Sequence, residues 1–137
     1  MNEQQLTDGR VARYCKPSSI DEQGSPTSAA FQRRPTEGYL SVFWLECFQH
    51  AHEKTRIHAV KQAMEQRRFT VKPRGQFAVL AIEQSTRYIL DEVAEQIVYR
   101  TMNLPHCGIF HDGDDLLIAE LLAECVQTSY EVKGLDE

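Results

Sequence analysis

Hydrophobic and polar residues along the chain repeat at the two spacings that distinguish helices from strands. The stretch EKTRIHAVKQAMEQRR, residues 53–68, places Ile57, Val60 and Met64 at helical spacing with polar residues between them. Thr55 near its start is a suitable N-cap. This stretch is therefore predicted to be an amphipathic helix.

Other segments alternate or run apolar in the manner of strands. QFAVLAI, residues 76–82, is apolar on both faces and is predicted to be a central strand of a sheet. Before it, RFTVKPRG alternates and then offers Pro73 and Gly75 for a tight turn, so residues 68–83 are predicted to form a β-hairpin. Short strands are also predicted at residues 10–15, 97–102 and 106–110.

The stretch YLSVFWLECFQHAH, residues 39–52, fits both structures. Its first half is aromatic and β-branched, which favours a strand. Ser41, however, is a good N-cap, and Val42, Leu45 and Phe48 follow at helical spacing. We favour a helix over residues 42–51.

Two further helices complete the pattern. Residues 85–96 are predicted to be helical with Ser85 as the cap, and residues 114–126 form a final, strongly apolar helix. The predicted fold class is therefore α+β: a small, mostly antiparallel sheet packed against three to four helices in a single domain.

Residues 16–38 interrupt this pattern. Nine of these 23 residues are Pro, Gly or Ser, which predicts a loop or a partly disordered segment. The sequence TSAAF within it can supply one helical turn.

Composition narrows the class of protein. With 42% hydrophobic and 26% charged residues over 137 positions, the chain has the balance of one globular domain. Its apolar runs are too short to cross a bilayer, its polar start lacks the apolar segment of a secretory signal, and its four cysteines form no C-x-x-C pair. We expect a cytoplasmic protein that does not contact membranes.

The charge is unevenly spread along the chain. Residues 1–74 carry 12 basic and 8 acidic residues, a net of +4, whereas residues 75–137 carry 3 basic and 12 acidic residues, a net of −9. Such a split can steer charged partners, or it can let the two halves attract each other within one fold. We favour the second explanation.

The densest chemistry lies in HCGIFHDGDD, residues 106–115. Histidines and aspartates are the ligands of zinc and of hydrolytic metal centres, and the nearby H-x-H pair could complete such a site. The candidate metal ligands are His106, His111, Asp112, Asp114, Asp115, His50 and His52. The aspartates, however, also suit the N-terminus of the final helix and an Asp-Gly turn, so we favour a cap and expect no cofactor.

A second candidate site is basic. Residues 54–74 hold seven basic residues, with only Glu65 and the preceding Glu53 as acids. An arginine pair lies in the loop at residues 33–34, where it could clamp a phosphate or a carboxylate. The candidate residues for binding an anion or a nucleic acid are Arg33, Arg34, Lys54, Arg56, Lys61, Arg67, Arg68, Lys72 and Arg74.

No complete catalytic constellation can be assembled from these residues. We therefore expect a small non-enzymatic binding or accessory protein that acts through contacts with another chain or a second copy of itself. The apolar final helix and the charge-split surface would make these contacts. The alternatives are a metal-assisted hydrolase of a phosphate-bearing substrate, which would need a divalent metal, and a nucleic-acid-binding module that uses residues 54–74.

Overall fold

A computed structural model describes residues 4–135, and its framework is a seven-stranded sheet in which every pairing is antiparallel. The spatial order of the strands is β1-β5-β6-β3-β2-β4-β7. The strands are β1 (Gln5–Leu6), β2 (Arg10–Cys15), β3 (Leu40–Trp44), β4 (Gln76–Ala81), β5 (Val98–Thr101), β6 (His106–Phe110) and β7 (Thr128–Glu131).

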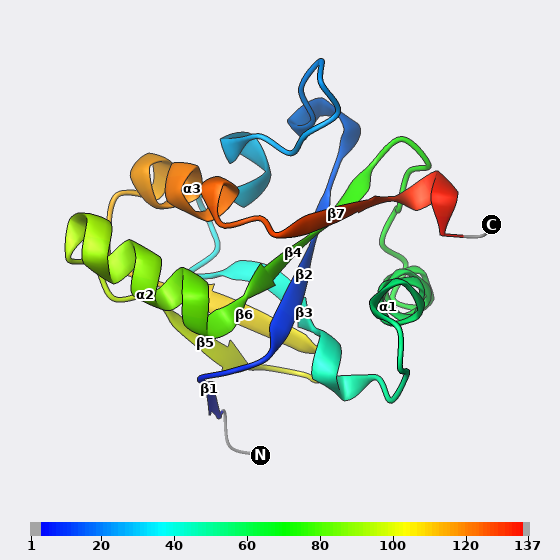
Figure 1. The fold of residues 1–137 in the computed structure, drawn as a ribbon, viewed down its shortest axis with the longest axis horizontal. Coiled ribbons are helices and arrows are strands. Elements are labelled where there is room, and N and C mark those ends of the chain that lie inside the picture. The colour runs from blue at the N-terminus through cyan, green and yellow to red at the C-terminus, as the bar shows by residue number, and fades with distance from the viewer. Residues whose placement is uncertain (1–3, 136–137) are drawn as a thin grey trace.

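Helices cover both faces of this sheet (Figure 1). They are α1 (Glu53–Gln66), α2 (Ile82–Val93) and α3 (Asp115–Glu124), with short 3₁₀ turns at Pro17–Ser19, Ser28–Phe31, Leu45–Cys47 and Val132–Gly134. In Figure 1, α2 and α3 lie together on one side of the sheet and α1 lies on the other. The molecule is therefore a three-layer α+β structure. None of the helices in residues 4–135 has the length and apolar character needed to cross a membrane.

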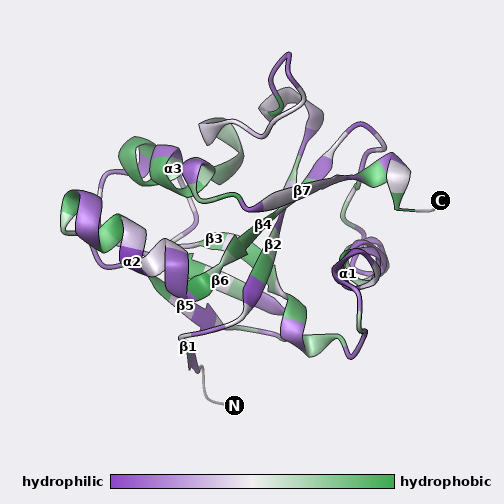
Figure 2. Cartoon of the chain, in the orientation of Figure 1, coloured by the Kyte–Doolittle hydropathy of each residue, from purple (hydrophilic) through white to green (hydrophobic). Residues whose placement is uncertain are grey.

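The two faces of the sheet contribute to two separate hydrophobic cores. In β4, Phe77 and Val79 pack with the α1 stripe, whereas Ala78 and Leu80 pack in the core of α2 and α3. Because successive side chains of a strand point to opposite faces, a strand between two cores must be apolar throughout. Figure 2 shows this as hydrophobic colour on the central strands and on α3, whereas α1 is mostly hydrophilic.

The sequence predicts much of this arrangement. The mixed α+β class, the central strand β4, the strands β2, β5 and β6, and the helices α1, α2 and α3 are confirmed. The helical turn in TSAAF is also present, and it buries Phe31 to 2% exposure. The sheet is larger than predicted, because β1 and β7 extend it at its two edges and β3 lies within it.

The predicted helix over residues 42–51 is wrong. Residues 40–44 form β3, and a 3₁₀ turn at Leu45–Cys47 follows. Val42 is buried in the core of α2 and α3, and Phe43 in the core of α1. This alternation between two cores has the two-residue period of a strand. The sequence shows no polar alternation there, because both faces of the strand are covered by apolar residues.

The predicted hairpin over residues 68–83 is wrong in its first half. Residues 69–75 form no strand, and β4 pairs instead with β2 and β7. The turn itself exists, since the amide of Gly75 donates to the carbonyl of Lys72 at 2.9 Å.

Two predicted caps are also wrong. The N-cap position of α1 is occupied by His52, and the helix begins at Glu53, so Thr55 lies inside it. Helix α2 begins at Ile82 directly after β4, which leaves Ser85 within its first turn, where its hydroxyl donates to the carbonyl of Ala81 at 2.7 Å.

Candidate anion-binding cleft

A cleft of about 520 Å³ opens where β2 and β3 separate. These strands pair only through Val11 with Trp44 and Ala12 with Phe43, although β2 continues along β4 as far as Cys15 and β3 continues along β6 as far as Leu40. Past the last shared pair, the facing backbone edges of β2 and β3 need other hydrogen-bond partners. The split in the sheet therefore creates a polar floor.

Arg13 fills part of this split. Its Nε donates to the carbonyl of Ala30 at 2.8 Å, and its Nη1 donates to the carbonyl of Ser41 at 2.8 Å. Burial lowers the pKa of Arg13, partly offset by the charges of Cys15 and Glu37. A guanidinium stays charged in proteins all the same, and within residues 4–135 no carboxylate forms an ion pair with this one. The cleft therefore contains a partly buried cation without a paired counter-ion.

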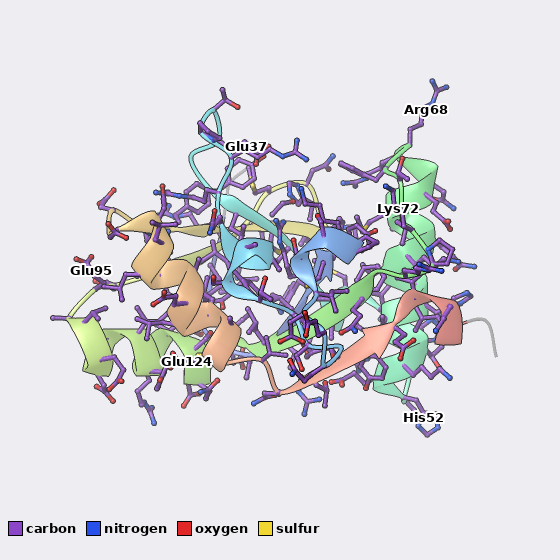
Figure 3. All side chains as sticks on the ribbon, turned by 90° about the horizontal axis from the view of Figure 1, so that it is seen from above. Glu37, His52, Arg68, Lys72, Glu95 and Glu124 are labelled. Atoms are coloured by element: carbon purple, nitrogen blue, oxygen red, sulfur yellow. The ribbon has the colours of Figure 1, made fainter. Side chains whose placement is uncertain are left out.

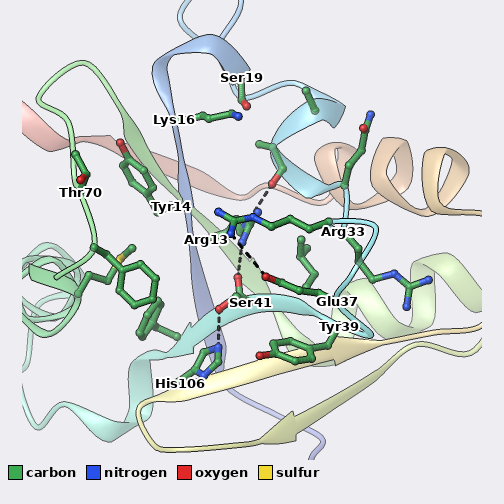
Figure 4. Close-up of a pocket in the computed structure, with 18 of the residues that line it drawn as sticks. Arg13, Tyr14, Lys16, Ser19, Arg33, Glu37, Tyr39, Ser41, Thr70 and His106 are labelled. Carbon is green, nitrogen blue, oxygen red and sulfur yellow. Dashed lines mark hydrogen bonds and ion pairs between the residues drawn. The ribbon is translucent and has the colours of Figure 1, made fainter. Parts of the chain in front are cut away.

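Further basic side chains surround Arg13, as Figure 4 shows. The cleft is lined by five cations and one acid: Arg13, Lys16, Arg33, Arg34 and Lys72, with Glu37. This excess is notable in a chain whose net charge is −5. A concave surface lined by charges of one sign strengthens the attraction of such a group for anions.

Arg33 and Arg34 differ in how many of their guanidinium donors are already bound to protein groups. Arg33 binds the Asp115 carboxylate at 2.7 Å and donates to the carbonyls of Gly38 and His111, so it mainly ties the loop to α3. Arg34 is largely exposed and approaches only Glu37, at 3.8 Å. Arg34 therefore keeps donors available for a ligand.

A serine and a histidine form the opposite wall. Ser41 Oγ and His106 Nε2 are 2.5 Å apart, on the neighbouring strands β3 and β6. Burial lowers the pKa of His106, as does the nearby Arg67, while Glu37 opposes the shift. The imidazole is therefore neutral near pH 7. No carboxylate among the described residues hydrogen-bonds to this histidine, so the pair lacks the third, orienting group of a nucleophilic triad.

The structure brings only part of the predicted basic set to the cleft. Arg33, Arg34 and Lys72 line it. The rest of the basic stretch is spread around α1 and the loop after it. Arg56 pairs with Glu46, Arg67 donates to the carbonyl of Asn103, and Arg68 projects from the end of α1 in Figure 3. Lys54, Lys61 and Arg74 are likewise not among the cleft residues.

The predicted metal ligands do not converge. Asp114 caps α3 by accepting from the amide of Leu117 at 2.9 Å, and Asp115 pairs with Arg33. His111 lies beside Asp115 at 3.6 Å, while Asp112 is exposed. No group of three or more His, Cys, Asp or Glu side chains that could hold a metal ion occurs in residues 4–135.

The two histidines proposed to complete that site lie elsewhere. His50 and His52 are exposed in the loop before α1. Gly113 packs against Glu95, and Figure 3 shows Glu95 and His52 at opposite ends of the molecule. The cluster at residues 111–115 therefore has a structural explanation in the cap and the ion pair.

Sequence reasoning missed Arg13, Lys16, Tyr39 and Ser41 as site residues. A signal for Arg13 exists, because it alternates with Val11 and Cys15 inside a strand, and a lone charge on an otherwise buried face is unusual. Ser41 was instead interpreted as a helix cap. A comparison with protein-family models, curated proteins and solved structures finds no match to this chain.

Proposed function

We propose that this protein binds a small anionic ligand in the cleft between β2 and β3. The observation that carries the proposal is the partly buried Arg13 guanidinium, which has carbonyl partners but no carboxylate, at the centre of a strongly basic cavity. A buried charge is costly unless an opposite charge compensates it, and an anionic ligand supplies that charge. The volume is that of a small-molecule site.

This proposal keeps the non-enzymatic class of binding protein expected from the sequence, but the partner is a small anion and not another protein chain. The alternative contact through α3 has less support, because Ile118, Ala119, Leu121 and Leu122 are already buried within the chain. Of the large apolar side chains of α3, Leu116 and Leu117 remain exposed. A hydrolase would need a metal-binding site or an oriented nucleophile, and the residues that line the cleft form neither.

Isothermal titration calorimetry with inorganic pyrophosphate tests the proposal. We expect binding at low ionic strength that weakens as salt is added, since the cleft opens to solvent. Arg34→Gln and Lys72→Gln should each weaken binding by about 1 kcal/mol, roughly fivefold in Kd, because each removes one exposed cation.

Arg74→Gln is the matched control, since Arg74 is exposed two residues beyond Lys72 but does not line the cleft. It should leave the affinity unchanged. The absence of binding at low salt would contradict the proposal, and so would an Arg74→Gln variant as impaired as Arg34→Gln.

A further inference from the structure

The end of the cleft opposite Lys16 is aromatic (Figure 4). The rings of Tyr39 and Phe43 flank His106, with centroid distances of 5.9 Å and 5.7 Å. All three residues line the cleft. Neutral aromatic faces of this kind are where planar ligand rings stack.

A fourth ring, Phe69, is exposed without a packing reason. It follows α1 in the loop that leads to β4, it lines the cleft, and it is 53% exposed. A large apolar side chain in contact with water at the mouth of a pocket gains stability when a ligand covers it.

The cavity holds both cationic and aromatic side chains, and one of its ends is aromatic. In Figure 4, Lys16 lies at one end, Tyr39 and His106 lie at the other, and Arg13 lies between them. Because His106 is neutral near pH 7, the positive charge is confined to the arginine and lysine side chains. A ligand that satisfies both regions must carry an anionic group and a planar ring on one small frame.

We propose that the ligand is a nucleoside phosphate, with its phosphate on Arg13, Lys16 and Arg34 and its base against Tyr39 and Phe69. This inference rests on the proposed function and names the ligand class of the same cleft. The same chemistry can come from a free nucleotide or from the phosphorylated end of an oligonucleotide. Pyrophosphate, which has no ring, would engage only the cationic part.

Calorimetric titrations of the full chain with AMP and with ribose 5-phosphate isolate the base, since the two share the phosphate and the sugar. We expect AMP to bind at least about tenfold more tightly, the usual scale of one base stacked on an aromatic side chain. Phe69→Leu should reduce this ratio several-fold with little effect on folding, because Phe69 is exposed. Tyr39→Leu should reduce it as well.

Phe48→Leu is the control, since Phe48 packs near α1 outside the cleft, and it should preserve the ratio. Equal affinities for AMP and ribose 5-phosphate would overturn the nucleoside inference while anion binding itself stands. Failure of both AMP and pyrophosphate to bind would overturn the proposed function as well.

A 5′-phosphorylated short oligonucleotide and its 5′-hydroxyl counterpart identify the source. Tighter binding of the phosphorylated oligonucleotide than of AMP supports the inference and assigns the ligand to a nucleic-acid end. Tighter binding of AMP supports it and assigns a free nucleotide. Equal binding of the two oligonucleotides, with none of AMP, would contradict it.

Discussion

Arg13 shows how a single side chain can hold open a split in a sheet. Its donation to the carbonyl of Ser41 links β2 to β3 beyond their last backbone pair, and its donation to the carbonyl of Ala30 ties β2 to the turn at Ser28–Phe31. The same geometry brings its positive charge into the cavity. Because Arg13 supports the fold as well as the proposed site, exposed Arg34 and Lys72 are the better positions for binding tests.

Buried histidines should make stability depend on pH. Burial lowers the pKa values of His106 and His111. As pH falls through the ordinary histidine value of about 6.5, the unfolded chain takes up protons before the folded one, so the free energy of unfolding decreases. The decrease ends once pH passes below the lowered folded values. Urea unfolding at about pH 7.5 and pH 5.5 measures it.

His106→Gln should reduce this loss of stability on acidification, because one of the two groups is removed. His52→Gln, at an exposed position before α1, is the control and should behave like the unmodified protein. Equal pH dependence in His106→Gln and in the unmodified protein would contradict the account.

At the scale of single residues, the sequence predicts those roles that depend only on neighbouring positions in the chain. Asp114 is recognisable as a cap because an Asp immediately before an apolar helix satisfies free amides there. Arg33 and Arg34 are predicted to bind an anion from their charge and adjacent positions, and both line the cleft. Ser41 is not recognisable as a site residue, because its role depends on His106, which is 65 positions away.

Among the elements, α3 gives the clearest test of that local chemistry. Asp114→Ala should destabilise the protein by about 1 kcal/mol, since it removes the side-chain acceptor for the amide of Leu117. Asp114→Asn should retain most of the stability, because Asn caps nearly as well. Chemical denaturation measures both.

Asp112→Ala is the matched control for α3. Asp112 is exposed in the same turn, and its side chain does not cap the helix. Its loss should change the stability by less than about 0.5 kcal/mol. An equal cost for Asp112→Ala and Asp114→Ala would show that general charge, and not the cap, stabilises the helix.

Elements whose structure depends on distant partners could not be predicted. Residues 40–44 have apolar residues on both faces, so their spacing fits a helix as well as a strand, and only their position between β2 and β6 decides. Similarly, β4 pairs with β2, more than 60 residues earlier, and with β7, which the sequence does not mark clearly. Strand pairing of this kind is a property of the whole sheet.

At the scale of the whole molecule, the uneven distribution of charge along the sequence is reflected in the lining of the cleft. The two halves interleave in one sheet, since β2 pairs with β4 and β3 pairs with β6, and Arg33 binds Asp115 across them. Apart from His106, every residue that lines the cleft lies within residues 13–72, the basic part of the chain. Five of the 12 basic residues in positions 1–74 therefore line the cleft where β2 and β3 separate, and the others lie elsewhere.

The most direct test is an NMR titration of the ¹⁵N-labelled protein with inorganic pyrophosphate at low ionic strength. Binding in the cleft predicts amide shifts that saturate and are confined to residues 13–19, 29–43 and 69–72, to Met64 and to His106. The absence of saturating shifts would contradict the account. So would shifts centred on Lys54 and Arg56, at the start of α1, with the cleft unaffected.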